Sequence, residues 1–414
     1  MKILLRNAHI YDIRSKHHDT KRDVLIEQGH ITKIAKRITS PGKAKVVTSP
    51  TLSISPGWLD IGTFNGEPGY EYREDLDTLR QAAVAGGYAA LAPFPTGHPT
   101  IDNKGQLHYL RSQTQDHIVE VYPIAAISKN RAGKELSELL DMAAAGAAGF
   151  SDGNASSDDE DVLIKALLYL KSCGGLVIQS AASQSPSGHV NEGEVSVRMG
   201  LEGMPTHLEK SRVQTLVRAS EYTESKMLIC NISTSEALGE IKKSSQLATL
   251  YGAIPFMNLI YDENDVVDFN LPLKVNPPLR SSKDKKALIK AITSGQVNII
   301  TSNHTPHSKE EKDQPFGMSE FGAATLEMVF SALVSQTDIP LDRLVHCLSI
   351  GPREALHVAC PMVAVGHEAC LTVFDSTVDT DVVTPKSKGT NSLVTNTQQK
   401  GKIIGVINGG KLSV

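Results

Sequence analysis

Residues 56–75 have the sequence PGWLDIGTFNGEPGYEYRED, and this stretch decides which fold the chain is expected to adopt. Preceded by Ser53-Ile54-Ser55, it opens with an apolar run that is punctuated by Pro56 and Gly57 and reaches Asp60 and Ile61. That pattern is typical of a buried parallel strand that the chain enters from a tight turn. The stretch therefore predicts one strand of a parallel sheet.

Outward from that strand, helix-like and strand-like segments alternate, as in βα units around a parallel sheet. Roughly eight such units favour a (β/α)8 TIM-like barrel over a doubly wound open sheet. A parallel barrel carries its site at the carboxyl ends of the strands. We expect helices at 75–85, 135–144, 159–172 and 282–294, and strands at 88–94, 147–150, 175–179, 227–232 and 297–301.

Both ends of the chain are rich in strand-like alternation of apolar and polar residues. Gln28-Gly29-His30 is a hairpin signal between two such runs. We therefore predict a small discontinuous β-sandwich domain built from 1–55 plus 362–414, with the barrel occupying 56–361.

The composition indicates an ordinary globular protein. Of 414 residues, 40% are hydrophobic and 21% are charged, and a net charge of -4 gives no electrostatic footprint for nucleic acid. Small-molecule or protein partners fit better. The five cysteines are scattered without a C-x-x-C pair, and no run of about 18 apolar residues occurs. We expect a cytoplasmic protein that has reduced thiols and no membrane association.

The frame P-G-x-x-D-I, followed by E-P-G-x-E-x-x-E-D, resembles the dihydroorotase family of the amidohydrolase superfamily. The resemblance covers nearly the whole chain and implies the barrel, the discontinuous β domain and a site for two divalent ions. In the family an H-x-H-x-R pattern lies between the two halves of the frame, where this chain has Gly62, Phe64 and Gly66. Neither Gly62 nor Phe64 has a lone pair to donate, so one metal loses two ligands.

The same loss is expected at other strand ends. Ser180 and Asn231 stand where the resemblance implies one metal-binding histidine each, and Asn303 replaces an aspartate that is both ligand and proton shuttle. A neutral amide is a poor zinc ligand and accepts no proton at physiological pH. We therefore predict a pseudoenzyme with these degenerate catalytic positions and no metal cofactor.

Asp152 and His304 are the weak metal candidates that remain. Asp152 is followed by Gly153, so an Asp-Gly turn is the competing interpretation. His304 and His307 are three residues apart in a run similar to the family's T-D-H-A-P-H. The alternative reading is an active dihydroorotase-type hydrolase of a cyclic amide, with a reduced or atypical zinc site at these residues or with no metal.

For substrate contacts, the resemblance leaves Asn276, Arg280 and His307. Asn276 and Arg280 lie in an N-P-P-L-R run, which alternatively is a loop made rigid by its prolines. The arginine that Gly66 replaces would have been the strongest grip on a carboxylate. The three retained residues are the polar groups we expect around a small molecule of the pyrimidine pathway.

By resemblance, some dihydroorotase homologues that lack the metal histidines assemble with aspartate transcarbamoylase. The sequence therefore predicts a catalytically inactive, dihydroorotase-like protein of pyrimidine biosynthesis that is a structural or regulatory partner of that enzyme. We expect it to form a homo-oligomer.

Overall fold

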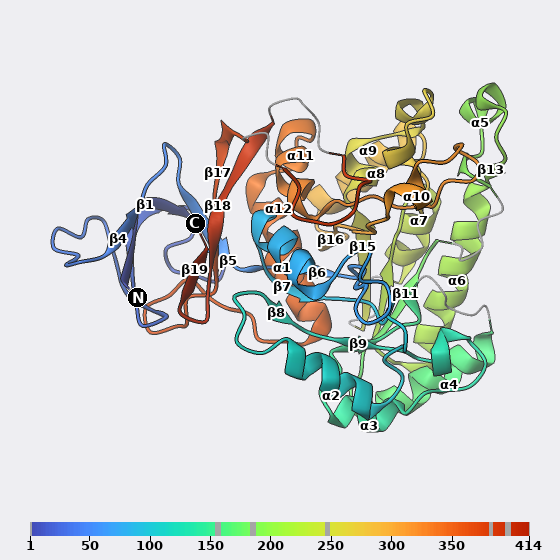
Figure 1. Cartoon of the computed structure of the whole chain (residues 1–414), viewed down its shortest axis with the longest axis horizontal. Helices are drawn as coiled ribbons and strands as arrows, with labels where there is room; N and C mark the ends of the chain where they lie inside the picture. The colour runs from blue at the N-terminus through green and yellow to red at the C-terminus, as the bar shows by residue number, and fades with distance from the viewer. Residues whose placement is uncertain are drawn as a thin grey trace.

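The computed structural model describes residues 2–153, 159–182, 188–244, 249–380, 384–393 and 399–413. Figure 1 shows a β-rich lobe that holds both ends of the chain, beside a larger lobe of helices and strands. The two lobes correspond to the sheet domain and the barrel predicted from the sequence.

The larger lobe is a ring of parallel strands. β8 pairs with β7 and β9 pairs with β10, so these two short strands together fill one position of the ring. The ring closes where Ser302, directly after β16, donates its backbone N–H and its hydroxyl to Asp60 of β6. The predicted barrel is confirmed. Its strands are β6 (Trp58–Ile61), β7 (Tyr88–Ala92), β8 (Glu120–Val121), β9 (Ile124–Ala125), β10 (Gly149–Phe150), β11 (Val177–Ser180), β14 (Met227–Cys230), β15 (Leu250–Pro255) and β16 (Ile299–Thr301).

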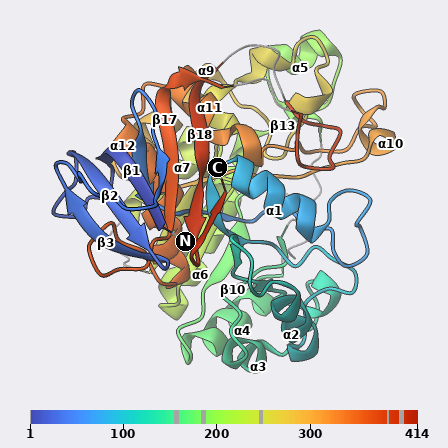
Figure 2. The same cartoon turned by 60° about the vertical axis from the view of Figure 1, so that its left-hand side comes forward.

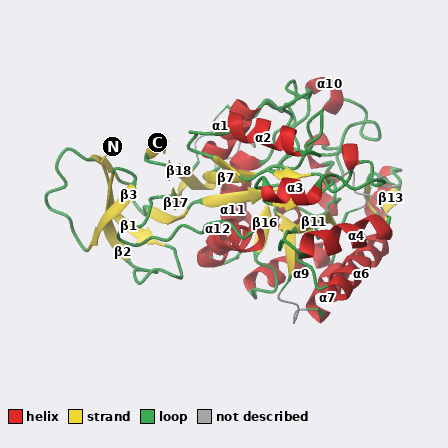
Figure 3. Ribbon diagram, turned by 90° about the horizontal axis from the view of Figure 1, so that it is seen from below, coloured by secondary structure: helices red, strands yellow, loops and turns green. Residues whose placement is uncertain are grey.

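Helices follow the strands and surround the ring, as the red ribbons around the yellow strands of Figure 3 show. The larger ones are α1 (Leu76–Ala85), α2 (Lys104–Gln113), α3 (Leu139–Ala144), α4 (Glu160–Lys171), α6 (Thr206–Thr223), α7 (Ser235–Lys243), α9 (Ser282–Thr293), α11 (Val329–Gln336) and α12 (Leu341–Leu356). Short pieces in the loops are α5 (Glu194–Met199), α8 (Met257–Ile260), α10 (Lys309–Lys312), and the two-stranded pair β12 (Val190–Asn191) and β13 (Gly203–Met204). Single 3-10 turns occur at Lys129–Arg131, Glu263–Val266, Leu271–Leu273 and Leu326–Met328.

The N-termini of α1 and α4 form as the sequence indicates. The carboxylate of Asp75 accepts the N–H of Thr78 at 2.8 Å and caps α1. Asp159 caps α4, and its acidic first turn faces the positive end of the helix dipole.

Several predicted elements were too long. α3 begins at Leu139 rather than at residue 135, because Leu136 forms a β-bridge with Ser128. β7 ends at Ala92 because Pro93 has no N–H to donate to a neighbouring strand. β14 ends at Cys230 because Asn231 adopts a φ of 60°.

The β-rich lobe is an eight-stranded sheet built from both ends of the chain. Its central contact is β17 with β5, antiparallel, which joins residues 371–374 to residues 53–56. Gln28 and Gly29, with φ of 51° and 79°, form the predicted hairpin turn between β2 and β3. The exact boundaries of the two domains stay a prediction. The strands are β1 (Lys2–Ile10), β2 (Lys21–Glu27), β3 (His30–Ala35), β4 (Lys45–Val47), β5 (Ser53–Pro56), β17 (Leu371–Asp379), β18 (Lys400–Asn408) and β19 (Lys411–Ser413).

Trp58 joins the two lobes. Its ring is fully buried and lies 4.9 Å from the ring of Phe330 and 5.6 Å from that of Phe374, centroid to centroid. Its backbone N–H donates to the hydroxyl of Thr372 at 3.1 Å. The first barrel strand is therefore fixed to the sheet by one aromatic side chain. Among the described residues, no helix has the length and apolar character needed to cross a membrane.

Candidate functional site

The end of β6 holds Gly62 in a conformation that leaves no room for a side chain. Its φ is 88°, in the left-handed region, and a Cβ there would lie 2.7 Å from the ring of Phe94. A histidine at this position would meet both backbone strain and a filled space. The first expected ligand position is therefore closed by packing as well as by its residue type.

Phe64 belongs to an aromatic cluster around Arg73. The guanidinium carbon of Arg73 lies 5.8 Å from the ring centroid of Phe64, 5.4 Å from that of Tyr70 and 5.6 Å from that of Tyr72. Arg73 also donates through Nε to Glu311 Oε1 at 2.8 Å. This cation–π and ion-pair cluster occupies the position of the second expected ligand.

Asp60 is a buried structural carboxylate that closes the barrel. Its Oδ1 accepts the N–H of Ser302 at 2.8 Å and its Oδ2 accepts the Ser302 hydroxyl at 2.5 Å. Burial raises the pKa of Asp60 to about 6, although the hydrogen bonds from Ser302 oppose this shift. Both oxygens are used within the fold.

Asp152 holds the loop that follows β9. Its Oδ1 accepts the N–H groups of Ile127 and Ser128 at 2.9 and 3.0 Å, and its Oδ2 accepts the Ser128 hydroxyl at 2.6 Å. Burial raises the pKa of Asp152, and the bonds from Ser128 partly offset it. Both oxygens already have donors, so Asp152 has a structural role that joins the end of β10 to the loop after β9. The Asp-Gly turn stays a prediction.

The barrel brings Ser180 and Asn231 together as their strand positions predict. Asn231 Nδ2 donates to Ser180 Oγ at 3.2 Å, and both side chains are buried. Arg212 Nε donates to the Ser180 carbonyl at 2.7 Å. A neutral hydrogen bond thus stands where the family resemblance implied two histidines.

Asn303 and His304, which follow β16, also form hydrogen bonds within the chain. Asn303 Nδ2 donates to the Asn276 carbonyl at 3.1 Å. His304 Nδ1 accepts the N–H groups of Thr325 and Leu326 at 2.9 and 3.3 Å, which places the ring proton on Nε2. His304 therefore keeps no lone pair for a metal.

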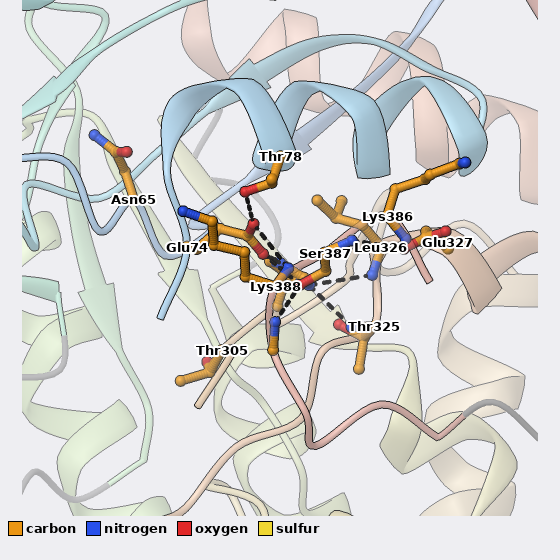
Figure 4. Close-up of polar contacts among 12 residues, drawn as sticks. Asn65, Glu74, Thr78, Thr305, Thr325, Leu326, Glu327, Lys386, Ser387 and Lys388 are labelled. Atoms are coloured by element: carbon orange, nitrogen blue, oxygen red, sulfur yellow. Dashed lines mark hydrogen bonds and ion pairs between the residues drawn. The ribbon is translucent and has the colours of Figure 1, made fainter. Parts of the chain in front are cut away.

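Glu74 contacts the Nε2 side of the His304 ring. Its Oε2 lies 3.4 Å from His304 Nε2 and also accepts the Ser387 hydroxyl, and its Oε1 accepts the Thr78 hydroxyl and the Lys388 N–H (Figure 4). Burial raises the pKa of Glu74, but the bonds from His304, Ser387 and Thr78 more than offset it, and the pKa is lowered overall.

Ser387 belongs to a segment that we call the strap, residues 384–393, which lies between β17 and β18. Asn391 of the strap accepts the His307 N–H at 3.0 Å and donates to the carbonyls of Thr305 and Gly322 at 2.9 and 3.0 Å. The strap is thereby fixed to the loop that follows β16. The connection between two strands of the sheet domain thus reaches residues at the carboxyl end of the barrel.

The predicted substrate contacts take part in internal networks. Arg280, only 5% exposed, donates to Ser233, Asn191 and the Met204 carbonyl and pairs with Glu209 Oε2 at 3.3 Å. This arrangement gives Arg280 a structural role.

The other two predicted contacts are also partnered within the chain. His307 Nε2 lies 3.0 Å from the Phe321 carbonyl, and burial lowers the pKa of His307. The backbone carbonyl of Asn276 accepts a hydrogen bond from the side chain of Asn303. Contact of Asn276, Arg280 and His307 with a substrate stays a prediction.

The donor set does not fit a zinc centre. A tetrahedral site requires at least three protein ligands, and over the described ranges no three His, Cys, Asp or Glu side chains are grouped so that they could hold an ion. Asp152 and His304 both spend their lone pairs on protein donors.

Sequence reasoning missed Glu74 and the strap. Glu74 was visible as the Glu of the E-D pair in the opening frame, but its partner Ser387 lies more than 300 residues away. The strap carries no motif that would place it on the barrel. Only the fold brings the two together.

Known proteins of one family are similar to this chain over most of its length. A family model described as Dihydro-orotase-like matches residues 52–237. The dihydroorotase of Syntrophus aciditrophicus (strain SB) is 30% identical over 424 residues, covering 100% of this chain and 99% of that protein. The dihydroorotase of Sulfurihydrogenibium sp. (strain YO3AOP1) is 31% identical over 420 residues, covering 97% and 99%.

Among solved structures, the fold is similar to that of L-hydantoinase (dihydropyrimidinase) from Arthrobacter aurescens, with a TM-score of 0.85 and 18% identity over 99% of this chain and 95% of that chain. D-hydantoinase (dihydropyrimidinase) from Thermus sp. gives a TM-score of 0.78 and 19% identity over 100% and 95%. At these identities the likeness shows the fold alone, a barrel with an attached β-sandwich domain.

Proposed function

The chain belongs to the dihydroorotase family of the amidohydrolase superfamily, and from this premise we propose that it is a catalytically inactive member that supports aspartate transcarbamoylase. The observation that carries the proposal is the state of the five altered positions. Gly62 is closed by Phe94, Phe64 packs on Arg73, Ser180 bonds Asn231, and Asn303 holds a backbone carbonyl.

Opening a cyclic amide requires an activated water and a polarised carbonyl, which binuclear amidohydrolases obtain from two divalent ions. None of the five altered side chains supplies a metal ligand of the required kind, and Asn303 cannot act as a base. Each oxygen of the retained carboxylates Asp60 and Asp152 already accepts a hydrogen bond from a protein donor. The residues at the strand ends thus stabilise the barrel and leave the chemical step without a catalyst.

The partner rests on the family resemblance. By resemblance, some dihydroorotase homologues that lack the metal histidines assemble with aspartate transcarbamoylase, and this chain has other residues at the corresponding positions. Hydrogen bonds from the strap hold the loop after β16 at the carboxyl end of the barrel, which we call the barrel mouth. A barrel held in this way is suited to a rigid structural role. We propose that the chain forms a homo-oligomer that holds the transcarbamoylase in its active assembly.

The test uses the purified chain and the aspartate transcarbamoylase of the same organism. Co-elution in size-exclusion chromatography, with a change in transcarbamoylase activity on mixing, is the expected result. Bovine serum albumin at equal concentration is the control for nonspecific stabilisation. If the two proteins elute separately and the activity does not change, the partnership is wrong, whatever the state of the barrel site.

An active cyclic-amide hydrolase is the second candidate, because the curated relatives carry the name dihydroorotase. Metal content of protein purified without chelators, together with assays of dihydroorotate formation and ring opening, separates the two. Stoichiometric zinc, or turnover that Asp152→Ala abolishes while the exposed Asp161→Ala retains it, would establish the enzyme. Absence of turnover in both directions would support the inactive member.

A further inference from the structure

A cavity of about 420 Å³ lies between α1, β18 and the strap, away from the residues described above. Figure 2 shows α1 beside the C-terminal strands. The strap contributes Lys386, whose side chain extends away from Glu74 along α1 in Figure 4. The volume falls in the range of about 300–1,000 Å³ that small-molecule sites occupy.

Three basic residues line the cavity, Arg80, His117 and Lys386. None of the described lining residues is acidic. Arg80 is only 6% exposed, and its Nε–H is buried without a hydrogen-bond acceptor among the described residues. A buried donor of this kind costs free energy unless an acceptor reaches it.

The other nitrogens of Arg80 and the ring nitrogens of His117 already have partners or a fixed protonation. Arg80 Nη2 donates to the Gln113 carbonyl at 2.8 Å, and Nη1 lies 3.7 Å from Asp77 Oδ1. His117 Nδ1 accepts the Val119 N–H at 3.0 Å, so the ring N–H is on Nε2. Burial lowers the pKa of His117, and the charges of Arg80 and Lys411 act in the same direction, while the charge of Asp77 opposes them.

The lining also includes apolar residues, among them Val84 of α1, Ile118 and Ile403 of β18. A ligand that satisfies both kinds of residue needs an anionic group and an apolar or planar body. A simple inorganic anion would pair with the basic residues and leave the apolar residues in water.

We propose that this cavity binds a small organic anion, with its carboxylate or phosphate group at Arg80, His117 and Lys386 and its body against Val84, Ile118 and Ile403. Occupancy also adds a contact to the strap. The Lys386 N–H donates to Glu327 Oε1 at 2.7 Å, and the next residue, Ser387, bonds Glu74. Binding is thereby linked to the segment that ties down the barrel mouth.

The test is isothermal titration calorimetry on the full chain with orotate, uridine 5′-monophosphate and inorganic phosphate. At least one of the two organic anions binds saturably, and inorganic phosphate binds more weakly. Lys386→Ala weakens binding by about tenfold, the loss of one charge-assisted hydrogen bond. Gln81→Trp, at an exposed lining position on α1, blocks the cavity without removing a charge.

Lys134→Ala is the matched control, because Lys134 is an exposed lysine outside the cavity. Both lining residues are exposed, so the variants fold, and thermal unfolding checks this. Absence of saturable binding by all three anions overturns the proposal. So does organic-anion binding that Lys386→Ala and Gln81→Trp leave unchanged, since the ligand then sits elsewhere. Inorganic phosphate that binds as tightly as the organic anions overturns the assigned ligand class.

Discussion

His304 Nε2 lies 3.4 Å from Glu74 Oε2, and this contact joins the loop after β16 to the start of α1 inside the barrel mouth. The same carboxylate accepts the Ser387 hydroxyl of the strap. One buried acidic side chain therefore connects three segments that are distant in the sequence.

Glu74→Ala is expected to lower the free energy of unfolding by about 3–5 kcal/mol, because it leaves the buried donors of His304 and Ser387 without this acceptor. Glu74→Gln keeps the shape and loses less. Urea unfolding followed by circular dichroism measures both, with the exposed Glu71→Gln as control. A loss under 1 kcal/mol for Glu74→Ala would show that water replaces these contacts.

Gly62→Ala is expected to cost about 1–3 kcal/mol, from its left-handed φ and from its collision with the ring of Phe94. Phe94→Ala removes the collision and leaves the φ strain, so the double variant loses less than the sum of the single losses. Gly239→Ala in α7 is the control, since a Cβ there meets nothing within 4 Å and should stabilise the helix. Additive losses at positions 62 and 94 would contradict the packing argument.

Asp60 gives the stability a definite pH dependence. Its folded pKa of about 6 is raised from 3.8 by burial, so its favourable contribution is complete below about pH 4 and is lost as the pH rises through 6. Relative to the native chain, Asp60→Asn should therefore gain about 2–3 kcal/mol between pH 4 and pH 7.

Asp375 provides the opposite sign for comparison. Burial opposes the shift, but the hydroxyls of Ser49 and Thr51 hold the pKa of Asp375 well below its usual value. The stability from Asp375 is present above pH 4 and is lost as the pH falls, so Asp375→Asn should be less harmful at low pH. Thermal melts of Asp60→Asn from pH 4 to pH 7, and of Asp375→Asn from pH 4 down to about pH 2, check the two slopes, and slopes of equal sign would contradict the assignment.

Asn391→Ala is expected to loosen the strap while the barrel stays folded. It removes three hydrogen bonds that join the strap to the loop after β16. Hydrogen exchange at the amides of His307 and Thr390 should quicken by about tenfold or more, in line with a local loss of 1–3 kcal/mol. Thr384→Ala, at an exposed strap position, is the control and should leave the exchange unchanged.

Much of the fold follows from local sequence. The helix near residues 75–85, the Gln28-Gly29 turn and the buried run through Asp60 are each set by neighbours in the chain, and each forms as expected. Element ends were less accurate. The start of α3 depends on a bridge between Ser128 and Leu136 that helix propensity does not describe.

In the candidate site, too, some features follow from the sequence and others only from the packing. That Ser180 and Asn231 meet follows from their places at the ends of adjacent strands. The role of Arg280 does not, because its partners Asn191, Met204 and Glu209 come from loops and a helix that no periodic pattern places near it. Residue types could show which donors had been lost, but only the packing shows that Phe94 fills the space beside Gly62.

The pairing of β5 with β17 also sets an order of events during synthesis. The backbone of Trp58 bonds Thr372, 314 residues later, so the first barrel strand leaves the ribosome long before its partner exists. Until β17 arrives, the edge of β5 and one side of the Trp58 ring stay uncovered. A nascent or truncated chain that stops before residue 371 therefore presents the unpaired edge of β5 to other chains. A chaperone that prevents aggregation at this stage would bind this edge.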